Sequence, residues 1–293
     1  MRWPRTRALG FFGLYLVCEC LGIVAASCIW LVTAGGRVGG RARFLGWNGV
    51  LQQWWANALF YGSVTLFSMK VHVEGGELGG PGPLLLLVRH SSTADTVLAA
   101  ALVSGPARMR LRYIIKEELL WDPCLDVVGR RLPNAFVARG SAHRDAELAM
   151  ISALARGLGP DEGVLIYPEG TRFSPARRDR AVAKLAASTR RSLVPIAEGY
   201  RAVLPPKVAG VLALLAAAPD ADVVFLEHTG FEGAATFADF WSGALIGRTV
   251  SARLRRFPAP VGSDEDKATW LFQRWAEVDG WICGVLAAEG RVP

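Results

Sequence analysis

The hydrophobic positions along the chain follow three successive patterns. Residues 9–33 form one apolar run, which as a helix reaches roughly 36 Å and is long enough to cross a bilayer with some tilt. Residues 42–70 are also apolar, but they are rich in aromatic residues and interrupted by Asn and Gln. From residue 84 onward, short apolar runs alternate with helical patterns, which predicts an α/β domain.

Six short apolar runs follow the Gly/Pro-rich stretch 75–83, and each is the length of a strand. They cover residues 84–88, 111–115, 135–138, 164–168, 192–196 and 222–226. Leu148, Ile151 and Ala155 recur at helical spacing between two of them, and Ser263 can cap a last helix with an apolar stripe. We therefore expect an α/β fold with a twisted, largely parallel sheet flanked by helices.

The apolar run 9–33 has three interpretations. A secretory signal peptide has a shorter apolar core and a polar start to the mature chain, whereas residues 29–32 are apolar again. A buried core helix is the second interpretation, and a membrane anchor, which we favour, is the third. Glu19 lies near the middle, where an ionised carboxylate is costly, so we expect it to be protonated, to face protein or to lie near an interface.

The aromatic segment 42–70 has two interpretations. Trp and Tyr favour the headgroup zone of a bilayer, which suggests an interfacial amphipathic helix or hairpin. The alternative is a Trp-rich helix packed on the main domain. We divide the chain into a membrane anchor (1–36), an interfacial amphipathic helical segment (37–74) and a main domain (75–293). Three arginines on each side of the apolar run leave its orientation open, although a shallow hairpin would keep both basic ends cytoplasmic.

Composition and charge narrow the class of protein. An apolar fraction of 52% excludes intrinsic disorder, and five cysteines in 293 residues are too few for a disulfide scaffold. No Cys/His cluster has the spacing of metal ligands, so no metal is expected. Of the net charge of +7, residues 1–43 supply +5, from six arginines against Glu19. Because this excess charge flanks the apolar run, it suggests a membrane surface as the anionic partner, and no nucleic acid is expected.

Residues with charged or catalytic side chains follow four of the predicted strands. They are His90 after 84–88, Lys116 after 111–115, Arg139 after 135–138, and Glu169, Gly170, Thr171 and Arg172 after 164–168. Ligands of open α/β sheets bind at the carboxyl ends of the strands. Three cations there suit a dianionic phosphate; the alternative is that charges simply follow strands where the chain reaches water.

His90 and Asp95 form the pattern H-x4-D. A neutral imidazole can take a proton from an attacking hydroxyl, and a carboxylate on its other nitrogen fixes the tautomer. Positions five apart lie about 140° apart on an α-helix, so the pair requires His90 in the turn after the strand and Asp95 in the first helical turn. Because the chain has no G-x-S-x-G elbow and no P-loop, we expect direct attack by the substrate hydroxyl.

Four ordered blocks resemble the glycerolipid acyltransferase family, in its lysophosphatidate acyltransferase group. The blocks are RHSSTAD (89–95), residues 116–140 with Lys116 and Arg139, YPEGTR (167–172) and LVPI (193–196). EGTRFSPARR, LPPK (204–207) and RRFP (255–258) further resemble the branch with eukaryotic lysophosphatidate and lysocardiolipin acyltransferases. The chain departs from the family pattern in three places. Arg89 and Ser91 flank His90 where Asn before it and Gln or Arg after it are common, Ala138 stands where an acid is frequent, and LPPK stands where that branch has Pro-Arg-Thr.

The resemblance implies roles for these residues and makes 75–293 the acyltransferase domain. His90 is the general base and Asp95 orients it. Arg172 shapes the acceptor-phosphate site with Glu169, Gly170 and Thr171, assisted by Lys116 and Arg139. Acyl-CoA or an acyl carrier protein thioester is the co-substrate, with no cofactor and no metal.

The implied function is acyl transfer to the free hydroxyl of lysophosphatidate, giving phosphatidate, in a membrane enzyme whose catalytic domain lies on the cytoplasmic face. Another lysophospholipid, glycerol 3-phosphate, or an acceptor without phosphate is the first alternative. A non-catalytic lipid-binding protein of the membrane surface is the second, because the residues around His90 are atypical. The partners are thus membrane lipids, the thioester and a phosphorylated lysolipid, and the oligomeric state stays open.

Overall fold

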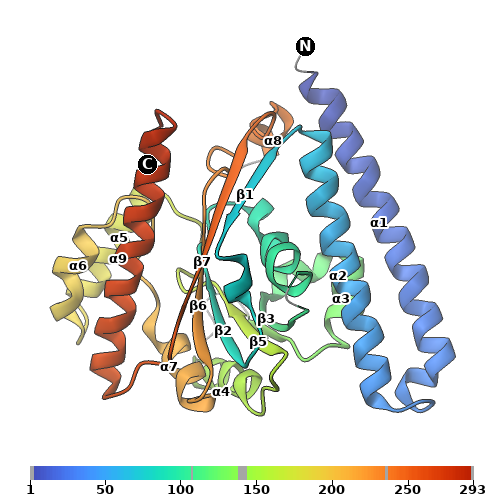
Figure 1. The fold of residues 1–293 in the computed structure, drawn as a ribbon, viewed down its shortest axis with the longest axis horizontal. Coiled ribbons are helices and arrows are strands. Elements are labelled where there is room, and N and C mark those ends of the chain that lie inside the picture. Colours follow the sequence, from blue (N-terminus) through green and yellow to red (C-terminus); the bar gives the residue numbers. More distant parts are fainter. Residues whose placement is uncertain (1–2, 107, 138–143, 235–236, 292–293) are drawn as a thin grey trace.

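A seven-stranded sheet with helices on both sides forms the centre of the molecule (Figure 1). The computed structural model describes residues 3–106, 108–137, 144–234 and 237–291. The strands are β1 (Lys70–Glu74), β2 (Leu84–Val88), β3 (Arg110–Lys116), β4 (Ala135–Val137), β5 (Glu162–Ile166), β6 (Asp222–His228) and β7 (Thr249–Phe257). Their order is β1-β7-β6-β2-β5-β3-β4.

The five strands from β6 to β4 are parallel to one another. β7 runs antiparallel to β6, and β1 pairs parallel with β7 at the edge of the sheet. The predicted α/β class with a largely parallel sheet flanked by helices is therefore confirmed.

The central strand β2 explains the uninterrupted run of leucines in the sequence. All five of its side chains are buried. Leu85 and Leu87 pack into the core beneath α9 (Asp264–Ala288), whereas Leu84, Leu86 and Val88 pack into the core on the other face. A strand that helices cover on both faces has no solvent side, so it has no need of alternating polar positions.

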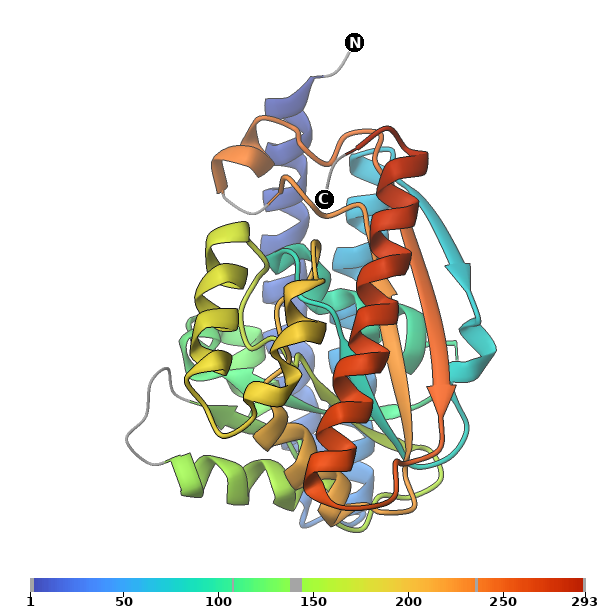
Figure 2. The same ribbon diagram turned by 90° about the vertical axis from the view of Figure 1, so that its left-hand side faces the viewer.

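The helices lie in two layers (Figures 1 and 2). With α9 on one side lie α4 (Arg144–Ala155), α5 (Pro175–Ala186), α6 (Val194–Glu198) and α7 (Val208–Ala217). On the other side lie α1 (Pro4–Thr33), α2 (Arg41–Leu66), α3 (Pro123–Gly129) and α8 (Phe237–Trp241).

The cap and the buried stripe predicted for the last helix are confirmed. The Ser263 hydroxyl accepts from the Asp266 N–H, and the Asp266 carboxylate accepts from the Ser263 N–H. Trp275 in the middle of the stripe is fully buried, and its indole N–H donates to the carbonyl of Leu204 at 3.0 Å. This bond fixes α9 against the segment that precedes α7.

The prediction of a strand over residues 192–196 is wrong. Arg191–Leu193 form a 3₁₀ turn and Val194–Glu198 form α6. Pro195 lies in the first turn of α6, where its missing N–H removes no helical hydrogen bond.

Strands β1 and β7 were not predicted. β7 carries arginines at half-buried positions between buried ones, so it lacks the apolar run that marks the other strands. Buried Glu227 on β6 balances two of these arginines, Arg253 and Arg255, through hydrogen bonds of 2.5–3.0 Å. Ion pairing across the sheet thus allows a basic strand to lie beside the core.

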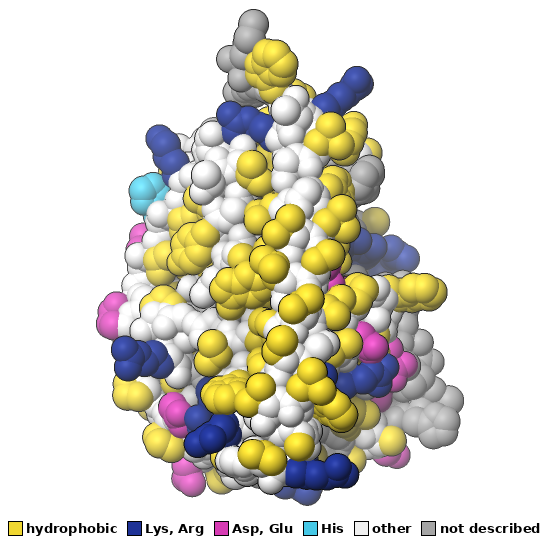
Figure 3. All heavy atoms as spheres, turned by 90° about the vertical axis from the view of Figure 1, so that its right-hand side faces the viewer, with side chains coloured by type: hydrophobic (Ala, Val, Ile, Leu, Met, Phe, Trp, Pro, Cys, Tyr) yellow, Lys and Arg dark blue, Asp and Glu magenta, His cyan; other side chains and the backbone are white. Residues whose placement is uncertain are grey.

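The N-terminal segments form an antiparallel helical hairpin of α1 and α2 beside the main domain (Figure 1). By length and composition α1 can cross a membrane, and 28% of its most apolar window is buried inside the structure. α2 confirms the helix expected within 42–70, but residues 70–74 form β1 and belong to the sheet. The exposed side chains on the outer face of the hairpin are largely apolar (Figure 3).

Glu19 on α1 faces protein, one of the three outcomes expected for it. One of its carboxylate oxygens accepts from the indole N–H of Trp55 on α2 at 2.8 Å. The other accepts from the backbone N–H of Cys124 on α3 at 2.9 Å. This single buried side chain therefore joins the hairpin to the main domain.

Candidate active site

The carboxyl ends of three neighbouring parallel strands meet at one edge of the sheet. β5 lies between β2 and β3, so the segments after these strands bring His90, Lys116 and the loop 169–172 to the same edge. β4 ends at this edge as well. Arg139, which follows it, lies outside the described residues. The predicted gathering of strand ends at one rim is thus seen for the described residues.

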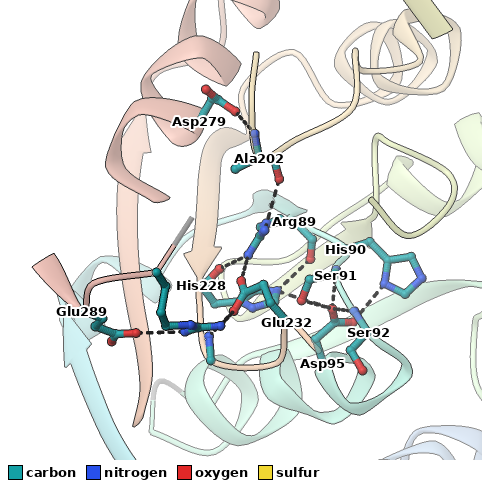
Figure 4. A network of polar contacts seen from close by, with 12 residues as sticks. Arg89, His90, Ser91, Ser92, Asp95, Ala202, His228, Glu232, Asp279 and Glu289 are labelled. Carbon is teal, nitrogen blue, oxygen red and sulfur yellow. Dashed lines mark hydrogen bonds and ion pairs between the residues drawn. The ribbon is translucent and has the colours of Figure 1, made fainter. Parts of the chain in front are cut away.

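His90 and Asp95 lie in contact at the end of β2. His90 follows the strand in an irregular turn, and Asp95 lies in the 3₁₀ turn Thr93–Val97. The imidazole Nδ1 is 3.0 Å from the Asp95 Oδ1. The histidine side chain is 12% exposed and the aspartate is fully buried. The turn placement that the spacing required is therefore the one found (Figure 4).

Asp95 is held as an ionised hydrogen-bond acceptor. Its Oδ2 accepts from the backbone N–H groups of Ser91 and Ser92 at 2.7 and 2.8 Å. Burial acts to raise the pKa of Asp95, but the hydrogen bond from His90, the two nearby histidines and the Ser92 amide hold it below its ordinary value. A carboxylate only accepts, so Nδ1 of His90 carries the proton and Nε2 presents its lone pair. Within the described part of the chain, no hydrogen bond to Nε2 occurs.

The loop after β5 is attached to His90 at both of its ends. The His90 N–H donates to the Glu169 Oε1 at 3.1 Å, and the Phe173 N–H donates to the His90 carbonyl at 3.1 Å. The Tyr167 ring also lies against the imidazole, with 4.8 Å between the ring centroids. Gly170, Thr171 and Arg172 lie between these attachments and therefore belong to the immediate surroundings of His90.

Glu169 is buried, and both of its oxygens accept from backbone amides. The second bond comes from the Leu204 N–H at 3.1 Å. Burial raises the pKa of Glu169 to about 8, against the opposing effect of Arg89 and of the two amides. The side chain thus ties together the loops that follow β2 and β5 and the segment before α7.

Arg89 is completely buried behind His90. Its guanidinium donates to the backbone carbonyls of His228 and Ala202, at 2.6 and 3.1 Å, and forms an ion pair with Glu232 (Figure 4). The charge of Arg89, which stands where the family commonly has Asn, is therefore balanced inside the protein.

His228 and Glu232 are site neighbours that the sequence analysis missed. The His228 Nε2–H donates to the Arg89 carbonyl at 2.9 Å, and the same nitrogen lies 3.6 Å from the Asp95 Oδ2. Burial lowers the pKa of His228, so it is neutral at pH 7. The signal that could have found it is its position at the end of the apolar run 222–226, since strand ends marked the other site residues.

The described residues contain no group of three or more His, Cys, Asp or Glu side chains that could hold a metal ion. The described side chains at this rim place an imidazole, oriented by a buried carboxylate, beside the loop that carries Arg172.

Comparisons with known proteins agree with the family resemblance drawn from the motifs. Residues 70–199 match the family model described as Acyltransferase. The 1-acyl-sn-glycerol-3-phosphate acyltransferase epsilon of Mus musculus is 25% identical over 126 residues, which are 43% of this chain and 33% of the relative. The chain thus matches about a third of the length of that relative.

A solved structure shares the fold. The 1-acyl-sn-glycerophosphate (LPA) acyltransferase PlsC from Thermotoga maritima superimposes with a TM-score of 0.56 at 19% identity, covering 92% of this chain and 96% of that one. The superposition covers nearly the whole of both chains. It shows that the fold is shared, while the match of residues 70–199 to the family model confirms the recognition made from the motifs.

Proposed function

Residues 70–199 match the acyltransferase family model, and on this premise we propose that the chain transfers a fatty acyl group from a thioester to the hydroxyl of lysophosphatidate. The observation that carries the proposal is the His90–Asp95 pair, in which Nδ1 is engaged and Nε2 is left to act as a base. The names of both relatives specify a 1-acylated glycerol phosphate as the acceptor, which supports this choice of substrate.

In the proposed reaction the acceptor hydroxyl attacks the thioester directly. His90 Nε2 takes the hydroxyl proton as the oxygen bonds to the carbonyl carbon, and the resulting imidazolium is stabilised by Asp95. The tetrahedral intermediate then collapses, the C–S bond breaks, and the thiolate takes the proton from His90. The products are phosphatidate and the free thiol of coenzyme A or acyl carrier protein, and His90 returns to its starting form.

The other predicted residues surround this base and are assigned by their contacts. We assign Glu169 to positioning, because it holds the backbone of His90 and Leu204. Arg172, in the loop attached to His90, and Lys116, at the end of β3, are assigned to the acceptor phosphate, as is Arg139. Gly170 and Thr171 complete the loop between them.

We further propose that the outer face of the hairpin lies in the membrane. Apolar side chains occur along the length of this face (Figure 3). They include Leu16, Val17, Leu21, Val24, Leu31, Trp47, Val50 and Trp54, all exposed. A contiguous apolar surface of this kind marks a membrane or protein contact. An acceptor that is itself a lipid would reach the enzyme from that membrane, with the catalytic domain on its cytoplasmic side.

The test is an acyltransferase assay on purified protein in lipid vesicles, with labelled acyl-CoA and, in a parallel arm, acyl carrier protein thioester. We expect phosphatidate from lysophosphatidate and a loss of about 10²- to 10⁴-fold in rate for His90→Ala, the range for removal of a general base. His72→Ala is the matched control, because His72 is exposed on the edge strand β1.

Full activity of His90→Ala would overturn the mechanism. Lysophosphatidylcholine and glycerol 3-phosphate in the same assay test the acceptor, and a wild-type protein that binds anionic vesicles but turns over none of these acceptors would overturn the assignment as an enzyme.

A further inference from the structure

We propose that Lys207 binds the phosphate of the lysolipid acceptor, as a specificity-determining residue next to the loop 169–172. This inference rests on the proposed function, because it concerns the acceptor of that reaction. Lys207 ends the LPPK segment, one of the departures from the related branch. It belongs neither to the motif residues assigned above nor to the hydrogen-bond network around His90, so it has no assigned role.

The first observation is the position of the Lys207 side chain over Gly170. A methyl group built on Gly170 would lie 2.5 Å from Nζ, 2.8 Å from Cε and 3.1 Å from Cδ of Lys207. The outer half of the lysine side chain therefore lies directly against the backbone of this loop. The Lys207 N–H also donates to the Pro168 carbonyl at 2.8 Å, which fixes the start of the side chain beside the same loop.

The second observation connects that loop to the proposed base. Glu169 and Phe173 bond the N–H and the carbonyl of His90, so Gly170 lies between two points attached to the reacting residue. Glu169 also bonds the N–H of Leu204, at the start of the segment that ends in Lys207. The backbone of segment 204–207 is thus attached to this loop at both of its ends, and the side chain of Lys207 is exposed.

The chemistry of the two substrates decides which phosphate this cation meets. In lysophosphatidate only a few covalent bonds separate the attacking hydroxyl from the phosphate, so a hydroxyl at His90 brings the phosphate to the surrounding loop. In acyl-CoA the whole pantetheine arm separates the thioester from the nearest phosphate. A cation beside Gly170 is therefore placed to bind the phosphate of the acceptor. Arg172 in the same loop supplies a second positive charge for that phosphate.

The glycine at position 170 fits the same interpretation. Its φ of +68° is a conformation that favours glycine, and a side chain there would displace the ammonium group. Two separate reasons thus favour glycine, backbone strain and the space that Lys207 occupies. A double-mutant cycle separates them, since only the second reason depends on Lys207.

The main test compares Lys207→Met with Lys207→Arg, and with Lys184→Met on the exposed last turn of α5 as the control. For Lys207→Met we expect the KM for lysophosphatidate to rise about 10-fold, the scale of one lost hydrogen bond to a charged group. The kcat and the KM for acyl-CoA stay within about 2-fold, and Lys207→Arg retains most of the wild-type KM. With monoacylglycerol as acceptor, wild type and Lys207→Met behave alike.

An unchanged KM for lysophosphatidate in Lys207→Met, or a rise in the KM for acyl-CoA instead, would overturn the inference. In the cycle, Gly170→Ala is expected to raise the KM less in the Lys207→Met background than in wild type. Strictly additive effects would show that the glycine serves backbone conformation only and would count against the proposed contact.

A binding measurement separates this inference from the proposed function. In a His90→Ala background, which removes turnover, lysophosphatidate should raise the Tm more than lysophosphatidylcholine does, and Lys207→Met should remove the difference. If the wild type fails to acylate lysophosphatidate but this difference persists, the reaction is wrong and the phosphate site stands. If acylation occurs and Lys207→Met changes neither binding nor KM, the proposed reaction stands and the assignment of Lys207 to the phosphate is wrong.

Discussion

The rim at the end of β2 and the helical hairpin of α1 and α2 each bury one carboxylate, and they use it in different ways. Asp95 at the rim accepts from two backbone amides and from the imidazole of His90. Glu19 in the hairpin accepts from an indole N–H and a backbone N–H. The indole and backbone donors to Glu19 are neutral groups that keep their protons, whereas the imidazole donor to Asp95 can gain and lose a charge.

This difference separates a structural carboxylate from one that can act in chemistry. Neutral donors satisfy a buried oxygen and hold two elements together, and nothing in the arrangement changes with the protonation of a substrate. An imidazole donor places a titratable nitrogen, Nε2, on the far side of the ring from the carboxylate. The carboxylate then determines which nitrogen is the base.

The largest effect that sharpens this comparison is expected for Asp95→Asn. The amide oxygen can keep the bonds from Ser91 and Ser92, while the amide N–H donates to the His90 Nδ1. The ring proton then moves to Nε2, which can no longer accept one. We expect kcat to fall by about 10²- to 10⁴-fold, with a change in Tm of only a few degrees, measured by acyl transfer and thermal unfolding.

Asp126→Asn is the control for this change, since Asp126 forms a half-exposed pair with Arg130 far from His90 in the chain. If Asp95→Asn kept a tenth or more of the wild-type kcat, Asp95 would belong with Glu19 as a structural carboxylate.

The next effect is expected on the hairpin side, for Glu19→Leu. This change leaves the N–H groups of Trp55 and Cys124 buried without their acceptor. We expect the free energy of unfolding to fall by about 2 kcal/mol, measured by denaturant unfolding in detergent, with the kcat per folded molecule unchanged. Leu16→Ala on the exposed face of α1 serves as the control. A large loss of kcat with intact stability would mean that the hairpin carboxylate takes part in the reaction.

The smallest effect is the change in stability between pH 7 and 8 that comes from the second carboxylate of the rim, Glu169. Burial raises its pKa to about 8 from an ordinary value of 4.5. Between these values the unfolded chain is ionised and the folded chain is protonated, so this contribution to stability is complete below pH 4.5 and is lost as the pH rises to 8. Between pH 7 and 8 we expect the free energy of unfolding to fall by about 1 kcal/mol through this group.

The measurement is the Tm of wild type and Glu169→Gln across pH 5.5–9. The difference between the two curves is the decisive quantity, because His228, with its pKa lowered by burial, favours the folded state as the pH rises through about 6.5. Parallel curves would show that Glu169 stays ionised in the folded protein.

Much of the fold follows from local patterns, and the exceptions have local causes. The run 84–88 became the buried strand β2, because burial on both faces of a strand produces an uninterrupted apolar run. The cap and stripe after Ser263 became α9, because burial on one face of a helix produces a helical period. The run 192–196 has the same composition as a strand but became a turn and α6 around Pro195. β7 was missed because Glu227, on another strand, balances its arginines.

The sequence by itself determined the class of the fold, the pairing of His90 with Asp95 and the family, because these depend on short runs and on spacings within a few residues. Only the tertiary structure decided that Glu19 faces protein, that Arg89 is balanced by Glu232, and that Lys207 lies over Gly170. These contacts join residues from 36 to 143 positions apart, and the side chains that form them obey no common period along the chain. They are selected by how the elements pack, which no local pattern encodes.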